Sequence, residues 1–262
     1  MSGPKMTAVT TGTFTLDKGK LMSFASGTVT IPVLCCVFQH PKHGVILWDT
    51  GVWEDVAEPD GPNHYWGEGI KTVFGAENLT HELSIKKQLD KLGIQPSDVS
   101  YVIYSHLHLD HAGGMSYFPN AVHVMQRDEL QYALCPGAWV RPVYVQKDFR
   151  DIHKLNLLQL GGDTDLFGDG TFMLLKAPGH APGMQCLLVT LPNQGRFILG
   201  GDVSHFRDQF EALVPMPWDY SCNLMTQSRQ RIKQLERSGM PVFLSHDVTE
   251  FEKLPNNGTW WD

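Results

Sequence analysis

The sequence predicts an α/β protein of layered strands and helices, because apolar runs of strand length and two amphipathic helices occur along its 262 residues. One helix is predicted from near Thr80 to Gly93 and the other from near Ser221 to Gly239. Each has a hydroxyl residue before it and a glycine after it, as helix ends commonly do. The length and the ordinary globular composition favour a single domain over residues 1–262.

Each predicted strand is a short apolar run between turn residues. In chain order the runs are Val29–Phe38, Val45–Trp48, Val99–Tyr104, Ala121–Met125, Phe172–Lys176, Gln185–Leu191, Phe197–Leu199 and Val242–Leu244. The first helix is expected to bury one face, made of Ile85, Leu89 and Leu92. The second is expected to bury a face made of Leu224, Ile232 and Leu235.

Charge and cysteine content narrow the class of protein. The net charge of −7 argues against a nucleic-acid partner, because neutralising phosphates requires a basic face. The five cysteines are odd in number and form no C-x-x-C pair, so we expect buried free thiols in a reducing compartment. No apolar run approaches the ~20 residues of a membrane helix, and the N-terminus lacks a secretory signal core. We therefore expect a cytoplasmic protein without a membrane partner.

A dense histidine cluster follows one predicted strand. The strand that ends at Ser105 runs directly into His106, His108, Asp110 and His111. In extended backbone, residues two apart face the same way, so the first three of these side chains can converge. Imidazole and carboxylate are ligands for borderline divalent metals, and the sequence therefore predicts a metal site here.

Three further strands lead to a possible ligand, namely His180, Asp202 and His246. Counting ligands predicts two metals: one set is His106, His108 and His180, and the other is Asp110, His111 and His246. Asp202 would bridge them, and two metals about 3.5–4 Å apart can share a hydroxide. Asp49 either orients a ligand histidine or is an ordinary turn carboxylate in Asp-Thr-Gly.

These residues resemble the metallo-β-lactamase superfamily, whose signature is His-x-His-x-Asp-His followed by downstream His, Asp and His. The resemblance implies an αβ/βα sandwich of two mixed β-sheets with helices on the outer faces. It also implies the same seven metal ligands. Within the superfamily the chain is most similar to N-acyl-homoserine lactonases, the quorum-quenching enzymes, in the stretches Ser105–Gly114, Pro178–Gly183 and Ser245–Asp247.

The resemblance and the two-metal arrangement together predict a dinuclear hydrolase that opens the lactone ring of N-acyl-homoserine lactones. In this hypothesis a hydroxide bridging the metals attacks the carbonyl, and Asp110 delivers a proton to the leaving group. His205 stands where that family usually has a substrate-contacting tyrosine, and its imidazole can donate to the carbonyl oxygen. Zinc is the expected metal, and cobalt, manganese and iron are compatible.

The substrate pocket is expected to include Met22, Phe24, Trp53, Trp66 and Phe74. The alternative is that these aromatic residues only pack their loop against the sheets. Trp260 and Trp261 could cover either the core or the pocket. The functional alternatives are a hydrolase of another lactone, aryl ester or phosphodiester, an iron-dependent persulfide dioxygenase, and a non-enzymatic binding module. The sequence leaves open whether the chain forms a homodimer.

Overall fold

Two mixed β-sheets form the centre of the fold, in a computed structural model that describes residues 3–67, 70, 74–75 and 78–262. The first sheet has the order β1 (Lys5–Asp17), β2 (Thr28–His40), β3 (Gly44–Trp48), β4 (Val99–Ile103), β5 (Val122–Gln126) and β6 (Asn156–Leu160). The second has the order β11 (Val242–Phe243), β10 (Gly195–Leu199), β9 (Gln185–Leu191), β8 (Phe172–Lys176) and β7 (Thr164–Asp165). Strands β3 to β6 pair in parallel, as do β10 and β11, and the other pairs are antiparallel.

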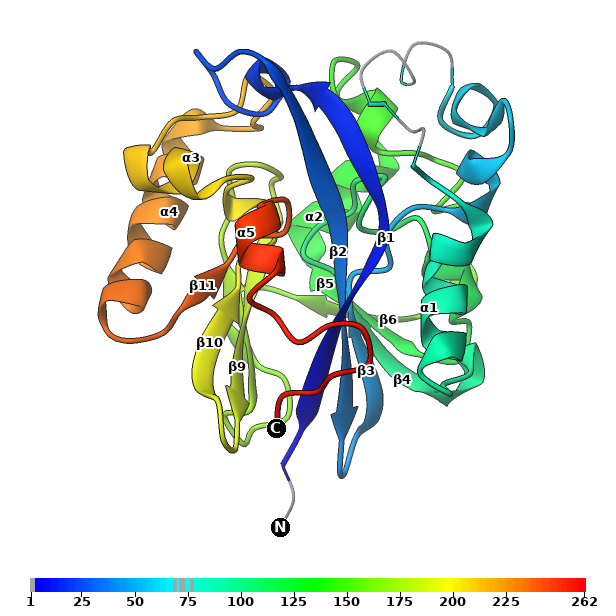
Figure 1. Cartoon of the computed structure of the whole chain (residues 1–262), viewed down its shortest axis with the longest axis vertical. Coiled ribbons are helices and arrows are strands. Elements are labelled where there is room, and N and C mark those ends of the chain that lie inside the picture. The colour runs from blue at the N-terminus through cyan, green and yellow to red at the C-terminus, as the bar shows by residue number, and fades with distance from the viewer. Residues whose placement is uncertain (1–2, 68–69, 71–73, 76–77) are drawn as a thin grey trace.

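Helices cover the outer faces of both sheets, as Figure 1 shows. On the first sheet they are α1 (Ile85–Lys91) and α2 (Arg127–Leu134), and on the second they are α3 (Arg207–Ala212) and α4 (Cys222–Arg237). The short α5 (Val248–Phe251) instead packs Phe251 against the core between the sheets. Ile85 and Leu89 of α1 pack on the first sheet, while Met225 and Ile232 of α4 pack on the second. The predicted αβ/βα sandwich is thereby confirmed.

Strand β2 shows how the sequence divides the core between the two faces of a sheet. Leu34, Cys36 and Phe38 point into the core between the sheets, whereas the alternate residues Val33, Cys35 and Val37 face the outer helices. Because both faces are covered, the strand is almost continuously apolar and was easy to find in the sequence. The edge strand β1 is rich in threonine and its register shifts between Thr10 and Thr13, so the apolar pattern missed it.

The predicted helices exist, but their details differ from the expectation. The first begins at Ile85, after a separate short turn over His81–Leu83, rather than near Thr80. The second begins after Ser221, whose hydroxyl accepts a hydrogen bond from Leu224 N at 3.3 Å. Of the expected buried face, Leu224 is exposed, whereas Ile232 is buried and Leu235 packs partly buried beside it. Met225, Ser228 and Arg229 complete the buried face of α4.

Cysteine burial and the C-terminus also test the sequence expectations. Cys35, Cys36 and Cys186 are buried free thiols, but Cys135 and Cys222 are exposed, so the expectation of buried thiols was wrong for two of the five.

Trp261 exchanges two 2.8 Å backbone hydrogen bonds with Met6 and packs against the core between the sheets. Within the described ranges, no helix combines the length and the apolar character needed to cross a bilayer.

Candidate metal centre

The predicted ligands gather at one edge of the sandwich, where several strands end. His106, His108, Asp110 and His111 follow β4, and His180 follows β8. Asp202 follows β10 and His246 follows β11. All seven are buried, with residue exposures of 9% or less. The chain therefore concentrates five imidazoles and two carboxylates in a space that excludes bulk water.

Among the described residues, five groups of three side chains place their ligand atoms within 4.8 Å of one another, and two of these groups match the predicted sets. The first is His106, His108 and His180, in which Nδ1 of His108 lies 3.0 Å from Nε2 of His180. The second is Asp110, His111 and His246. In this group the two carboxylate oxygens of Asp110 lie 3.7 Å from Nε2 of His111 and 3.5 Å from Nε2 of His246. These are the two sets that counting ligands along the sequence produced.

The carboxylate of Asp202 lies between the two groups. Its Oδ1 is 3.4 Å from Nε2 of His111, and its Oδ2 is 3.2 Å from Nε2 of His246. Oδ2 is also 3.6 Å from Nε2 of His180 and 4.0 Å from Nε2 of His106. One side chain thus reaches ligand atoms of both groups, as a bridging carboxylate must.

The chemistry of these donors fits two divalent cations. Two atoms bound to one tetrahedral zinc at about 2.0–2.1 Å lie about 3.4 Å apart, close to the observed separations. Nε2 of His106, Nε2 of His111 and Oδ1 of Asp202 are buried and lack a hydrogen-bond partner among the described residues. Each such atom would cost about 1–3 kcal/mol if it stayed unpaired. The buried His/Asp clusters are consistent with a dinuclear metal site.

The electrostatics of the site favour neutral imidazoles at His106 and His108 and a positive charge at His111. Burial and the neighbouring histidines hold the pKa of His106 and His108 well below its usual value, which keeps a nitrogen lone pair available. Burial alone would also lower the pKa of His111. The carboxylates around it, Asp202 first and then Asp110, outweigh burial and raise that pKa well above its usual value. The negative charges of Asp202 and Asp110 therefore favour a positively charged group between them, which a metal ion would supply.

The ligand histidines are oriented through their second ring nitrogens. Nδ1 of His111 lies 2.8 Å from Oδ2 of Asp49, and Nδ1 of His246 lies 2.8 Å from the carbonyl oxygen of Pro32. Nδ1 of His180 lies 3.3 Å from Oδ1 of Asp219. Partners of this kind fix the tautomer and the ring orientation of a metal ligand. Asp219 was missed because nothing in its local sequence links it to His180.

Glu129 of α2 is a second residue that the sequence did not reveal. Its buried carboxylate accepts hydrogen bonds from Leu107 N and Gly183 N, both at 3.0 Å. It also accepts one from the hydroxyl of Tyr144 at 3.0 Å. Leu107 lies between two ligands and Gly183 closes the loop that carries His180, so one carboxylate ties together the two loops of the first ligand group. Burial raises the pKa of Glu129.

His205 lies next to the bridging carboxylate. Its Nε2 is 3.2 Å from Oδ2 of Asp202, and its ring stacks on His246 with centroids 5.3 Å apart and an interplanar angle of 12°. Its backbone N–H donates to Oε1 of Gln209 at 2.9 Å, which fixes the loop. The Nδ1 atom is buried without a partner among the described residues.

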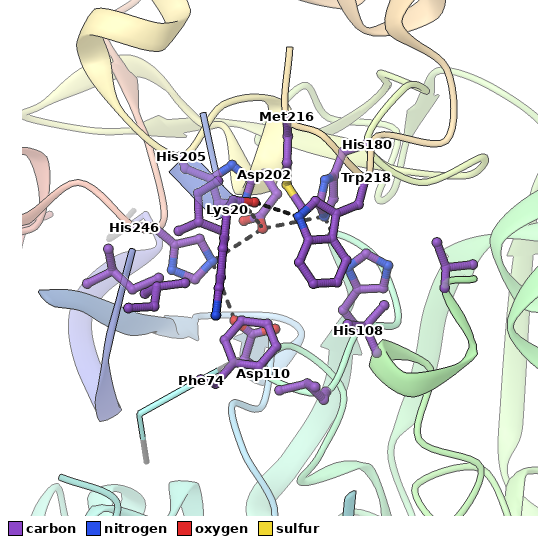
Figure 2. A pocket seen from close by; sticks show the side chains of 16 residues that line it. Lys20, Phe74, His108, Asp110, His180, Asp202, His205, Met216, Trp218 and His246 are labelled. Atoms are coloured by element: carbon purple, nitrogen blue, oxygen red, sulfur yellow. Dashed lines mark hydrogen bonds and ion pairs between the residues drawn. The ribbon is translucent and has the colours of Figure 1, made fainter. Parts of the chain in front are cut away.

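A pocket opens directly onto these residues, as Figure 2 shows. Its floor contains His108, Asp110, His180, Asp202, His205 and His246. Its other described walls are largely apolar, and they are Leu16, Lys20, Leu21, Ile31, Phe74, Leu109, Val140, Val143, Met216 and Trp218.

Of the five expected pocket residues, only Phe74 is among the described residues that line this pocket. Phe24 is 99% exposed, and Met22 packs at the edge of the core. Trp53 stacks on Tyr117, with ring centroids 4.6 Å apart, and Trp66 packs on Phe74. These four stay predictions as substrate contacts, and the two tryptophans make ring contacts with Tyr117 and Phe74. Residues 68–69 and 71–73 of that loop lie outside the described residues.

Comparison with known proteins finds a matching family and similar enzymes. The family model described as the metallo-beta-lactamase superfamily matches residues 30–238. The N-acyl homoserine lactonase AttM of Azorhizobium caulinodans is 36% identical over 233 residues, which cover 86% of each chain. AiiA, an N-acyl homoserine lactonase of Bacillus thuringiensis subsp. kurstaki, is 30% identical over 90% of this chain and 86% of its own.

A solved structure extends the similarity to the whole fold. It is an N-acyl homoserine lactone hydrolase with the product N-hexanoyl-L-homoserine bound at its catalytic metal centre. It superposes with a TM-score of 0.84 at 26% sequence identity and covers 100% of both chains. The family match spans most of the chain. The chain therefore belongs to the metallo-β-lactamase superfamily.

Proposed function

We propose that this chain is a metal-dependent hydrolase that opens the lactone ring of N-acyl-homoserine lactones. The observation that carries the proposal is the carboxylate of Asp202, which reaches both ligand groups on the floor of a largely apolar pocket. The relatives named as N-acyl homoserine lactonases support the choice of substrate. An enzyme of this kind in a bacterium that meets such signals would quench quorum sensing.

The metals would be held by the seven ligands, and zinc is the expected identity, with cobalt, manganese or iron compatible with the same donors. His106, His108 and His180 would hold one ion, and Asp110, His111 and His246 the other. Asp202 would join the two. When bound, such a pair supplies a nucleophilic water of lowered pKa and polarises the substrate carbonyl.

Two side chains are assigned direct contact with the substrate. Nε2 of His205 faces the metal-binding carboxylate at the pocket floor and can donate a hydrogen bond to the carbonyl oxygen as charge develops on it. Asp110 also lines the pocket and would carry a proton to the departing ring oxygen. The remaining walls exclude water and accept an acyl chain.

The character of the described pocket walls also bears on the choice of substrate. These largely apolar walls suit the hydrocarbon chain of an acylated lactone better than a charged phosphodiester.

The proposal is tested by measuring ring opening of N-acyl-homoserine lactones with several chain lengths, beside p-nitrophenyl esters and a phosphodiester, using metal-loaded protein. Higher kcat/KM for the lactones than for the esters and the phosphodiester is expected. Preference for either of the other substrates would contradict the proposed substrate class. Turnover by an Asp202→Ala variant stripped of metal would contradict the proposed mechanism.

A further inference from the structure

Lys20 is a cation among the largely apolar described walls of the pocket. It belongs to the turn η1 (Lys18–Lys20) between β1 and β2, and it is half-buried. In Figure 2 its side chain runs along the pocket, and its ammonium lies at the end nearer Asp110 and Phe74. Neither the metal ligands nor the residues assigned to the reaction include it.

The backbone of this turn is fixed relative to the metal centre. Nε1 of Trp218 donates to the carbonyl oxygen of Lys20 at 2.7 Å, and Nε2 of Gln209 donates to that of Leu21 at 2.7 Å. Oε1 of the same Gln209 side chain accepts a hydrogen bond from the backbone N–H of His205 at 2.9 Å. One buried amide thus connects the loop of His205 to the residue after Lys20. The backbone position of Lys20 relative to the loop of His205 is therefore set by the fold.

Lys20 is also a rare polar group in its part of the pocket. Among the described lining residues away from the floor, the others are apolar apart from Trp218, whose indole N–H is already used by the Lys20 carbonyl. A substrate amide that enters such a wall leaves water. Without a partner, each of its polar atoms would cost about 1–3 kcal/mol. The ammonium of lysine carries three donors and no acceptor, so it matches a carbonyl oxygen.

We propose that Lys20 donates a hydrogen bond to the amide oxygen that joins the acyl chain to the lactone ring. The inference rests on the proposed function and extends it to specificity. Lys20 makes the pocket select lactones that carry an acylamino group over lactones with only a hydrocarbon substituent. The metal centre treats the two rings alike, because both present the same ester carbonyl.

The test compares two substrates in metal-loaded protein. One is N-hexanoyl-homoserine lactone, and the other is an α-alkyl-γ-butyrolactone with a chain of matched length and no amide. A hydrogen bond from a charged donor contributes about 1.5–3 kcal/mol, which corresponds to roughly 10- to 150-fold. Lys20→Met should therefore lower the ratio of kcat/KM, acylamino over alkyl lactone, by at least tenfold. The loss should lie mainly in KM, since the bond forms in both the ground and transition states.

Two control variants separate the amide contact from other effects. Lys20→Arg keeps a charged donor and should retain more of the ratio than Lys20→Met does. Lys18→Met removes a lysine of the same turn that contacts Asp208 at 2.7 Å and is not among the described residues that line the pocket, so the ratio should stay at the wild-type value. An equal loss on both substrates in Lys20→Met would overturn the inference in favour of a structural role.

An unchanged ratio in Lys20→Met, with the wild type active on the acylamino lactone, would overturn the inference and leave the proposed function standing. A wild-type protein that opens the alkyl lactone and not the acylamino lactone would overturn both. The two failures are thus distinguished by the wild-type measurement alone.

Discussion

Oδ2 of Asp49 lies 2.8 Å from Nδ1 of His111 and also accepts a 2.8 Å hydrogen bond from the hydroxyl of Ser105. Asp49 directly follows β3, and His111 belongs to the loop after the neighbouring strand β4. The pairing of two strands therefore places a buried carboxylate behind the imidazole of a candidate metal ligand.

Replacing this carboxylate should weaken metal binding. In Asp49→Asn the side chain that orients His111 loses its negative charge. Removal of such a partner typically costs about 10- to 100-fold in metal affinity or activity. The dissociation constant is measured by competition with a chelator of known affinity. Asp151→Asn, at an exposed carboxylate, serves as the control. Equal metal affinity in Asp49→Asn and the wild type would show that Asp49 does not tune the site.

His205 should affect the reaction and leave the metal content intact. His205→Phe removes the donor next to Asp202, and loss of one donor of this type costs about 100-fold in kcat, at the lower end of the known range because the metals share the task. His205→Tyr restores a donor and should recover part of the rate. Metal analysis accompanies the kinetics. Because His205 also lies within ligand distance of Asp202 and His180, loss of a metal ion in His205→Phe would instead identify it as a ligand.

Glu129 should stabilise the two loops of the first ligand group. In Glu129→Gln one acceptor oxygen becomes an N–H donor that faces another donor, at a cost of about 1–3 kcal/mol in the free energy of unfolding. Tyr144→Phe removes only one of the three donors and should cost less. Urea unfolding measures both variants. A Glu129→Gln protein as stable as the wild type would refute this role.

The buried carboxyl group of Asp148 should make the free energy of unfolding depend on pH. Burial raises its pKa to about 8, and the hydroxyl of Tyr65 donates to it at 2.7 Å. Because the pKa in the folded state lies above the unfolded value of about 3.9, its stabilising contribution is complete below pH 4 and is lost as the pH rises through 8. Between pH 6 and pH 8 the wild type should lose about 2 kcal/mol relative to Asp148→Asn, since one pKa unit corresponds to about 1.4 kcal/mol.

The difference between the two proteins is the quantity to measure, because the metal ligands titrate in both. Urea unfolding at a series of pH values from 5 to 9 gives it directly. A difference that stays constant over this range would show that Asp148 keeps an ordinary pKa in the folded protein.

The metal ligands could be predicted because their geometry is local or repeated. His106, His108, Asp110 and His111 follow one strand, and the three other predicted ligands each follow another strand end. β10 and β11 pair in parallel, and β8 runs in the same direction as β10 because both pair antiparallel with β9, so these strands end at one edge. The strands buried on both faces were also visible, whereas β1 and the short β7 lack a continuous apolar run.

The surroundings of the site could not be predicted in the same way. Asp219 contacts His180 across 39 residues, and Glu129 contacts Leu107 across 22, through loops whose path depends on tertiary packing. Aromatic content marked Trp53 and Trp66 as pocket residues, but it does not say which way a side chain faces. Lys20 carried no signal, because a lysine in a turn is usually a solvated residue.

The most direct test of the two-metal account is metal content and lactone opening measured on the same sample. The account predicts two divalent ions per chain, with ring opening lost when they are removed and restored when they return. Asp202→Ala should lose both properties together, because its carboxylate reaches both ligand groups. Full ring opening by metal-free protein, or by protein that holds a single ion per chain, would contradict the account.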